Sequence, residues 1–351
     1  MQSLIVQRTL SGKRIGIRGE RSEQGNGYDR TLHKWEVKFL KKITVAMYDA
    51  EGYTARLAKY FTHHQCDILD VRLFTNEESL QKYFSAHSVD LLLVDEDMMD
   101  MLPNLSDKVY KQILLSDGQR VRESAAEKVL FKYQSAECIL QEVLSMIADD
   151  DKIYVPTRKK QMGGTRFVGV YAPFGGAGVS TLALRLARSY DGAEKCLYVD
   201  MELFDGIGNE LESKAGDSWR NVYQGGMSDL IFFLRQNKDK LGLKVESLVR
   251  HGEQVDYIAA VEDYRDLYQM TTENLHRFLR VLTEETQYSH IVFDIGFFSE
   301  MTMELLKCLD AFYMPQPQTD RQRKKQQSFE SLLRREGELD VISEIQYVAV
   351  E

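Results

Sequence analysis

The sequence VGVYAPFGGAGVSTLAL, residues 168–184, joins an apolar strand to a helical segment through a turn rich in glycine. Glycines let the backbone of such a turn approach a bound group closely, and a helix that begins there directs free N–H groups and the positive end of its dipole into the same space. An anion of the size of a phosphate group fits this arrangement. The stretch therefore predicts a phosphate-binding loop between a strand at 166–171 and a helix at about 179–190.

The residues after this loop continue the pattern of an α/β domain. Two short apolar runs, at 197–200 and 291–294, each end in an acid, Asp200 and Asp294. Such runs are typical of buried parallel strands, whose carboxyl ends meet at one edge of the sheet. We therefore predict a doubly wound domain over 166–351 with both acids near the loop. Taken singly, each acid is also typical of a strand end that only faces solvent.

A first α/β domain is predicted over residues 43–148. Apolar runs and segments of helical spacing alternate along it, with strands predicted at 43–48, 67–74, 89–94, 112–116 and 128–132 and helices at 53–64, 77–85 and 135–147. This order is typical of a second doubly wound sheet. Residues 149–165 contain a triple Asp, basic residues and paired glycines without periodicity, so we predict a linker there.

Polar side chains follow several strands of this first domain. Asp49 and Glu51 follow the first strand, Asp95 the third, Ser116 the fourth and Lys132 the fifth. Carboxylates gathered at one edge can hold Mg²⁺, a hydroxyl can bind a phosphoryl oxygen, and a lysine can neutralise the remaining charge. The pattern therefore predicts a phosphoacceptor site with Asp95 as the acceptor. Acids that merely solvate the ends of a sheet remain the alternative.

The composition is that of an ordinary soluble globular protein of two domains. The chain has 351 residues with 43% hydrophobic residues, 28% charged residues and 5 prolines. No apolar run approaches the roughly 18 residues of a membrane-spanning helix. Residues 1–42 contain ten Lys and Arg and four acids, so their net charge is +6. Because the whole chain has a net charge of −9, residues 43–351 have a net charge of −15. We predict a basic leader at 1–42 and assign it no function.

The four cysteines are widely spaced and form no C-x-x-C pair, at Cys66, Cys138, Cys196 and Cys308. This spacing argues against a zinc site or a disulfide framework and favours buried thiols in a reducing compartment.

The glycine-rich turn resembles the deviant Walker A loop of the ParA/MinD ATPases, whose pattern is K-G-G-x-G-K-[ST]-[ST]. The residues that match it are Gly175, Gly176, Ala177, Gly178, Val179, Ser180 and Thr181. Both lysines of the pattern are replaced, the first by Phe174 and the second by Val179. The resemblance implies a P-loop domain that binds ATP, and the lost charges imply weak or absent hydrolysis.

The same resemblance implies roles for residues outside the loop. Ser180 and Asp294 would hold Mg²⁺, and Asp200 would position the attacking water or a water on the metal. Pro315 and Gln316 follow a predicted strand at the place where this fold contacts adenine.

The segment 43–148 resembles the response-regulator receiver domain, a flavodoxin-like fold. The segment departs from that family at two positions. Ala50 stands where the family usually has a second acid after the first strand, although Glu51 follows it, and Tyr133 stands where the family usually has a proline after the lysine. Fewer metal-binding acids weaken the binding of Mg²⁺. A receiver fold kept as a docking or dimerising module is therefore as plausible as a phosphorylated one.

A receiver-like domain joined to a ParA/MinD-like domain resembles the TadZ/CpaE family of pilus-assembly proteins. The resemblance implies a cytoplasmic protein at the cell pole, or at the membrane through partners, that dimerises with ATP and helps recruit a tight-adherence (type IVb) pilus machine. We therefore predict an ATP-binding localisation or scaffold protein with the pilus machinery as its partner. No motif that reads DNA is found, so no specific nucleic acid is expected as a partner.

Two other functions stay open. An active partition-type ATPase would need a compensating cation, for which the candidates are Arg321, Arg323, Lys324 and Lys325. A solvated basic face is the plainer interpretation of that run. A two-component response regulator would be phosphorylated on Asp95.

Overall fold

The computed structural model describes most of the chain after residue 41. The described residues are 42–48, 52–101, 107–118, 128–155, 164–190, 195–206, 225–252 and 254–350, with the backbone of two short paired strands, β1 (Ile15–Gly16) and β2 (Lys38–Phe39). Nearly all of the basic segment 1–42 lies outside these residues, as do Asp49 and Glu51.

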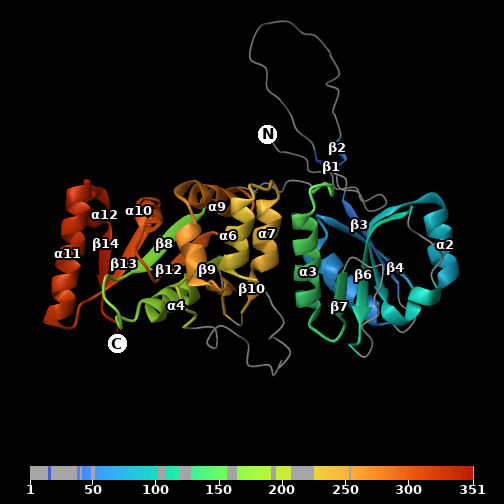
Figure 1. Ribbon diagram of the computed structural model, residues 1–351, viewed down its shortest axis with the longest axis horizontal. Coiled ribbons are helices and arrows are strands. Elements are labelled where there is room, and N and C mark those ends of the chain that lie inside the picture. Colours follow the sequence, from blue (N-terminus) through green and yellow to red (C-terminus); the bar gives the residue numbers. More distant parts are fainter. Residues whose placement is uncertain are drawn as a thin grey trace, which may run out of the picture. The chain divides into compact units, whose positions relative to one another are not determined.

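The chain divides into two compact units, which are described separately (Figure 1). They are Met1–Ile139 with Lys152–Pro156, and Leu140–Asp151 with Thr157–Glu351. Helix α3 (Ala136–Asp149) runs across this division. The predicted domain limits at 148 and 166 stay predictions.

The first unit contains a sheet of five parallel strands in the order β4-β3-β5-β6-β7. The strands are β3 (Ile43–Tyr48), β4 (Leu69–Phe74), β5 (Val89–Asp95), β6 (Val109–Ser116) and β7 (Lys128–Phe131). This is the strand order of the flavodoxin-like doubly wound sheet. All five predicted strands are confirmed, with β4 beginning two residues later and β6 three residues earlier than predicted.

Two helices of the first unit each bury apolar residues that lie about one turn apart on the same face. They are α1 (Tyr53–Gln65), which buries Leu57 and Phe61, and α2 (Glu77–Ala86), which buries Leu80 and Phe84. A 3₁₀ helix, η1 (Glu96–Met101), follows β5 directly. The side chains of β5 are nearly all buried, as expected of a central parallel strand covered on both faces.

The second unit contains a sheet of seven strands in the order β10-β11-β9-β12-β8-β13-β14. The strands are β8 (Arg166–Tyr171), β9 (Cys196–Met201), β10 (Arg250–His251), β11 (Asp256–Ile258), β12 (His290–Ile295), β13 (Ala311–Pro315) and β14 (Ile345–Val348). All neighbours are parallel except β10, which pairs antiparallel with β11. The predicted strands at 166–171, 197–200 and 291–294 are confirmed.

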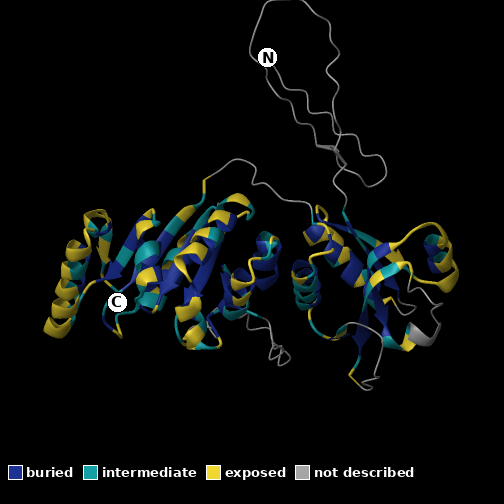
Figure 2. Ribbon diagram, turned by 45° about the horizontal axis from the view of Figure 1, so that its top comes forward, coloured by how far each residue is buried: buried dark blue, intermediate teal, exposed yellow. Residues whose placement is uncertain are grey.

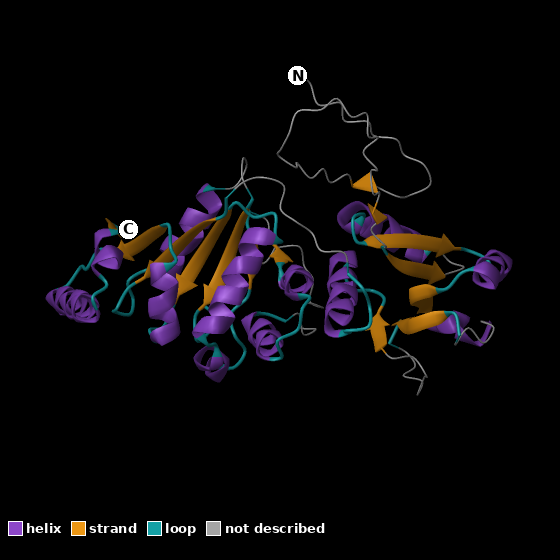
Figure 3. Cartoon of the chain, turned by 90° about the horizontal axis from the view of Figure 1, so that it is seen from above, coloured by secondary structure: helices purple, strands orange, loops and turns teal. Residues whose placement is uncertain are grey.

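Helices flank the strands of this second sheet, as Figure 3 shows. They are α4 (Val179–Ser189), α6 (Met227–Arg235), α7 (Leu241–Leu248), α8 (Tyr264–Gln269), α9 (Thr272–Glu284), α10 (Glu300–Lys307), α11 (Asp320–Glu336) and α12 (Leu339–Ser343). The helix predicted at about 179–190 is α4. Its buried residues, Leu182, Ala183 and Ala187 among them, join a core cluster with Tyr198 and Val292 of the sheet.

Burial is concentrated in the strands of each unit, while the outer faces of the helices are exposed (Figure 2). This pattern is that of an α/β protein with parallel sheets. Within the described part of the chain, no helix combines the length and the apolar composition that crossing a bilayer requires.

Candidate functional site

The glycine-rich turn connects β8 to α4 and has the backbone conformation that the sequence predicts. Gly176 has φ of 66° and Gly178 has φ of 76°, a left-handed region that favours glycine. Gly178 is the N-cap of α4, and its carbonyl accepts a hydrogen bond of 2.9 Å from the N–H of Leu182. A Cβ at Gly178 would lie 2.8 Å from Cγ1 of Val350, so a side chain there would also have to displace Val350.

The turn opens into a cavity of about 670 Å³. This volume is within the usual range for small-ligand sites. The loop from Tyr171 to Thr181 lines it, together with Glu202, Gly206 and the segment from Ile295 to Phe298. The lining segments therefore come from the carboxyl ends of β8, β9 and β12, which is where parallel sheets gather ligands. All seven predicted loop residues, from Gly175 to Thr181, line the cavity.

Apolar side chains occupy the two loop positions at which the sequence pattern has lysines. Phe174 is buried, with 4% of its surface exposed, and Val179 packs against the core cluster beneath α4. None of the described lining residues is Lys or Arg. A phosphate group in the cavity would therefore be bound by loop N–H groups and by whatever cation the nearby acids hold.

Two buried acids lie side by side beneath the cavity. Asp294 of β12 and Asp200 of β9 are register partners, and they are 0% and 2% exposed. Tyr198 donates a hydrogen bond of 2.5 Å to Oδ2 of Asp294, whereas Oδ1 is buried without a hydrogen-bond partner. A buried carboxylate oxygen without a partner is costly unless a cation or a proton occupies it.

Burial and mutual repulsion raise the pKa values of these acids. Burial is the largest cause for Asp200, the charges of Asp294, Asp205 and Glu202 add to it, and the pKa of Asp200 rises to about 8. Burial also raises the pKa of Asp294 and the pKa of Glu202, the latter with a contribution from the charge of Asp294. A divalent cation bound among these carboxylates would remove the repulsion.

Glu202 is a site residue that the sequence analysis missed. It lines the cavity, its N–H donates a hydrogen bond of 2.9 Å to Oδ1 of Asp200, and Ser180 donates one of 3.4 Å to its Oε1. Glu202 stands directly after the end of β9, two residues after Asp200, and this position in the sequence could have indicated its place in the site. Asp200 and Asp294 are not among the described lining residues, so Glu202 is the acid that reaches the cavity surface.

The residues present fit Mg²⁺ in the chemistry of their donors. Ser180, Glu202 and Asp294 offer hard oxygen atoms near the phosphate loop, and the unpartnered Oδ1 of Asp294 is available to a metal or to a water on it. The predicted set of Ser180, Asp200 and Asp294 stays a prediction, to which the geometry adds Glu202.

The predicted adenine residues are not among the described residues that line this cavity. Pro315 ends β13, and the N–H of Gln316 donates a hydrogen bond of 2.8 Å to the carbonyl of Val348. Neither residue is among those that line the cavity. Their contact with adenine stays a prediction, and the lining of the cavity does not support it.

A second cavity, of about 590 Å³, lies along α11. Arg321, Lys324, Lys325 and Arg335 line it together with Pro173, which also lines the first cavity. Three of the four predicted compensating cations, Arg321, Lys324 and Lys325, thus line a cavity that the loop residue Pro173 also lines. Arg323 differs from them because it pairs with Asp320 at 2.6 Å.

In the first unit, three of the five predicted phosphoacceptor residues lie in described residues and are buried at the carboxyl edge of the sheet, Asp95, Ser116 and Lys132. Nζ of Lys132 lies 3.0 Å from Oδ2 of Asp95. Burial lowers the pKa of Lys132, but the hydrogen bond and charge of Asp95 outweigh this and raise it. Ser116 donates a hydrogen bond to the carboxylate of Glu96 and accepts one of 3.1 Å from the N–H of Gly118.

Comparisons with known proteins give only distant similarities. No protein-family model and no curated protein matches the sequence. Among solved structures, a ParA-family ATPase from Chlorobium tepidum is 16% identical with a TM-score of 0.40, over 53% of this chain and 73% of its own.

Two further structures come from Borrelia burgdorferi. A plasmid partition protein is 18% identical over 53% of this chain and 77% of its own, and a putative plasmid partition protein bound to AMPPNP is 21% identical over 53% and 74%. Both have a TM-score of 0.40. Similarity at this level carries no weight for the fold or the function of this chain.

Proposed function

We propose that this protein binds ATP with Mg²⁺ in the cavity beside Gly176 and Gly178 and serves as a localisation or scaffold protein, with weak or absent hydrolysis. The observation that carries the proposal is the phosphate loop itself: two left-handed glycines precede α4 and open into a cavity whose described lining holds no Lys or Arg. In this proposal ATP stabilises a homodimer, and the assembly recruited is a tight-adherence pilus machine in the cytoplasm or at the cell pole.

Binding of ATP would use groups that are present. The loop N–H groups and the N-terminus of α4 would hold phosphate oxygens. Ser180, Glu202 and Asp294 would hold Mg²⁺, which supplies positive charge next to the β- and γ-phosphates when it is bound. Losing one lysine contact to phosphate costs about 1.5–3 kcal/mol, or roughly ten- to a hundredfold in affinity, so binding survives.

Hydrolysis would suffer more than binding. Phosphoryl transfer depends on positive charge at the oxygens that gain charge in the transition state, and such a contact can contribute several orders of magnitude in rate. Phe174 and Val179 supply no charge at the positions where the sequence pattern has lysines. Asp200, which has a raised pKa and is buried, is the residue we assign to water positioning should turnover occur.

The position of Pro173 favours one alternative, a partition-type ATPase. Because Pro173 lines both cavities, Arg321, Lys324 and Lys325 are the cations that we would assign to compensate for the missing lysines. This alternative requires ATP turnover that depends on those side chains.

The ion pair between Lys132 and Asp95 favours a second alternative, a phosphorylatable regulator. Asp95, Ser116 and Lys132 supply an acceptor carboxylate, a hydroxyl and a cation at one edge of a sheet. Asp49 and Glu51 would complete the set as acids for Mg²⁺.

Phosphate release and molecular mass, measured on the same samples with ATP and Mg²⁺, distinguish the scaffold function from the partition-type ATPase. The scaffold function predicts that ATP increases the mass to that of a dimer with negligible release of phosphate. Release that falls when Arg321, Lys324 and Lys325 are changed to Ala would instead support the partition-type ATPase. If ATP does not bind, does not change the mass and is not hydrolysed, both the scaffold function and the partition-type ATPase are rejected.

A further inference from the structure

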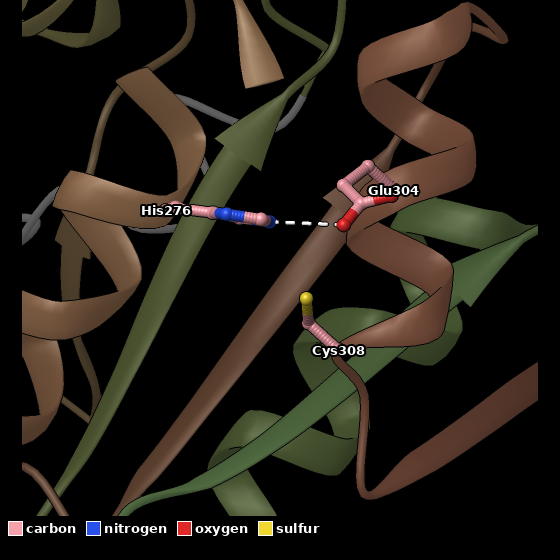
Figure 4. Close-up of side chains that lie close together, drawn as sticks. All are labelled: His276, Glu304 and Cys308. Carbon is pink, nitrogen blue, oxygen red and sulfur yellow. Dashed lines mark hydrogen bonds and ion pairs between the residues drawn. The ribbon is translucent and has the colours of Figure 1, made fainter. Parts of the chain in front are cut away.

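Three side chains that can bind a metal meet between two helices of the second unit. His276 lies on α9, and Glu304 and Cys308 lie on α10 and at its C-cap. Figure 4 shows the three directed toward one another. Nε2 of His276 is 3.0 Å from Oε1 of Glu304, and one ligand atom of each residue lies within 4.8 Å of the others. We call this group the His-Glu-Cys cluster.

The two helices are fixed by packing on their other faces. A capping box of Thr271 and Asn274 begins α9, and Ser299 caps the start of α10. Buried residues of the two helices include Phe278 and Leu305. Because residues four apart lie on one face of a helix, Glu304 and Cys308 face the same side, at the seam with His276. The cluster is therefore held in place by elements that do not depend on a ligand.

The carboxylate of Glu304 is oriented by a cation on its far side. Nζ of Lys307 lies 3.6 Å from Oε2 of Glu304 and 2.7 Å from Oε1 of Glu338. Oε1 of Glu304 is the oxygen that faces His276. Partners that orient a ligand in this way are typical of metal sites, where they fix the ligand's geometry.

The distances are close to those of a tetrahedral metal. A zinc ion bound at about 2.0–2.1 Å by nitrogen and oxygen and about 2.3 Å by sulfur holds its ligand atoms roughly 3.3–3.6 Å apart. The pair of His276 and Glu304, at 3.0 Å, is already near this spacing, and the thiol of Cys308 lies within 4.8 Å of both ligand atoms. A combination of imidazole, thiolate and carboxylate favours Zn²⁺ over Mg²⁺ or Ca²⁺.

We propose that His276, Glu304 and Cys308 form a zinc-binding site that links α9 to α10, with water as the fourth ligand. The sequence predicts no zinc site because these residues are 28 and 4 positions apart and share no short motif. The site is separate from the phosphate cavity, since none of the three residues lines it. On binding, the thiol of Cys308 releases its proton to solvent and the thiolate coordinates the ion; no oxidation occurs.

The site is connected to the cavity through one short segment. Residues Ile295 to Phe298 line the cavity, and α10 begins directly after them. A metal between α9 and α10 would therefore hold the helix that follows this segment. The inference does not depend on the proposed function, because it concerns only the His-Glu-Cys cluster.

Titration with Co²⁺ tests the site in the full-length, chelator-treated protein. We expect one equivalent of Co²⁺ to give a thiolate-to-cobalt charge-transfer band that Zn²⁺ displaces. Cys308→Ser should abolish the band, and His276→Gln should weaken Co²⁺ binding at least about tenfold. Cys66→Ser, which changes an exposed cysteine elsewhere, should leave the band unchanged. The acids near Ser180 offer only oxygen and give no such band.

A second measurement on the unmutated protein guards against misfolded variants. Zn²⁺ should slow the alkylation of Cys308, followed by peptide mass spectrometry, and leave that of Cys66 unchanged. A charge-transfer band that survives Cys308→Ser, the absence of a band in the unmutated protein, or equal alkylation of Cys308 with and without Zn²⁺ would each overturn the proposal.

Discussion

Tyr198 donates a hydrogen bond of 2.5 Å to Oδ2 of Asp294, and both residues are inaccessible to solvent. This bond satisfies one oxygen of a carboxylate whose other oxygen has no partner. Burial raises the pKa of Asp294, the hydroxyl groups of Tyr198 and Ser180 lower it, and any cation that binds nearby would lower it further.

Removal of the Tyr198 hydroxyl should destabilise the protein most where Asp294 is ionised. Tyr198→Phe removes the hydrogen bond to Oδ2 of the buried carboxylate and raises the pKa of Asp294 further. We expect a loss of about 1–3 kcal/mol in the free energy of unfolding at pH 8 without Mg²⁺, and a smaller loss at pH 5. Urea denaturation at the two pH values measures it. Equal losses of unfolding free energy at pH 5 and pH 8 would contradict the ionisation of Asp294 at the higher pH.

Stability without metal should fall as the pH rises from about 4 to about 8. The pKa of Asp200 is raised from 3.8 to about 8, so in this range the folded state binds a proton that the unfolded state has released. Unfolding then releases a proton, and higher pH favours it. Asp200→Asn should reduce this slope, and Mg²⁺ should reduce it in the unmutated protein. Urea denaturation across this range tests it, and an unchanged slope in Asp200→Asn would show that another group is responsible.

A lysine restored to the loop should strengthen ATP binding. Val179 is the first residue of α4 and lines the cavity, so Val179→Lys places an ammonium group beside the phosphates. We expect ATP affinity to rise roughly ten- to a hundredfold, with a loss of about 1 kcal/mol in stability from the lost apolar packing. Val179→Met is the matched control, because it has similar length without charge. Calorimetry with ATP compares them, and equal affinities would argue against phosphate at this position.

The acid site of the first unit should act independently of the phosphate loop. If Asp95 accepts a phosphoryl group, acetyl phosphate with Mg²⁺ should add one such group to the protein, and Asp95→Asn should not be modified. Intact-protein mass spectrometry follows this. ATP affinity should be unchanged in Asp95→Asn. Modification of both proteins to the same extent would place the acceptor elsewhere.

Local patterns were enough to predict the phosphate loop and the central strands. The run from Val168 to Leu184 combines strand, glycine turn and helix within one short segment, and β3, β5, β8 and β12 are mostly apolar. Features of this kind depend on residues close in sequence, which is why β8 and α4 begin where they were predicted.

Features that depend on side-chain direction or on distant residues were not predictable in the same way. Glu202 reaches the cavity while Asp200 is buried, because Asp200 lies within β9 and Glu202 follows the end of that strand. The His-Glu-Cys cluster requires the packing of α9 on α10. Gln316 followed a correctly predicted strand, yet its N–H is bonded to Val348 and it does not line the cavity.

The most direct test of the central claim is calorimetry of ATP and Mg²⁺ with Gly176→Asp and Gly337→Asp. Both glycines have left-handed φ values, 66° and 83°, and an added Cβ would meet no atom within 4 Å at either. The two changes therefore cost similar backbone strain, but only Gly176 lies in the phosphate loop. We predict that ATP binds to the unmutated protein and to Gly337→Asp and not to Gly176→Asp. Normal binding by Gly176→Asp, or no binding by the unmutated protein, would contradict the assignment of this loop as the nucleotide site.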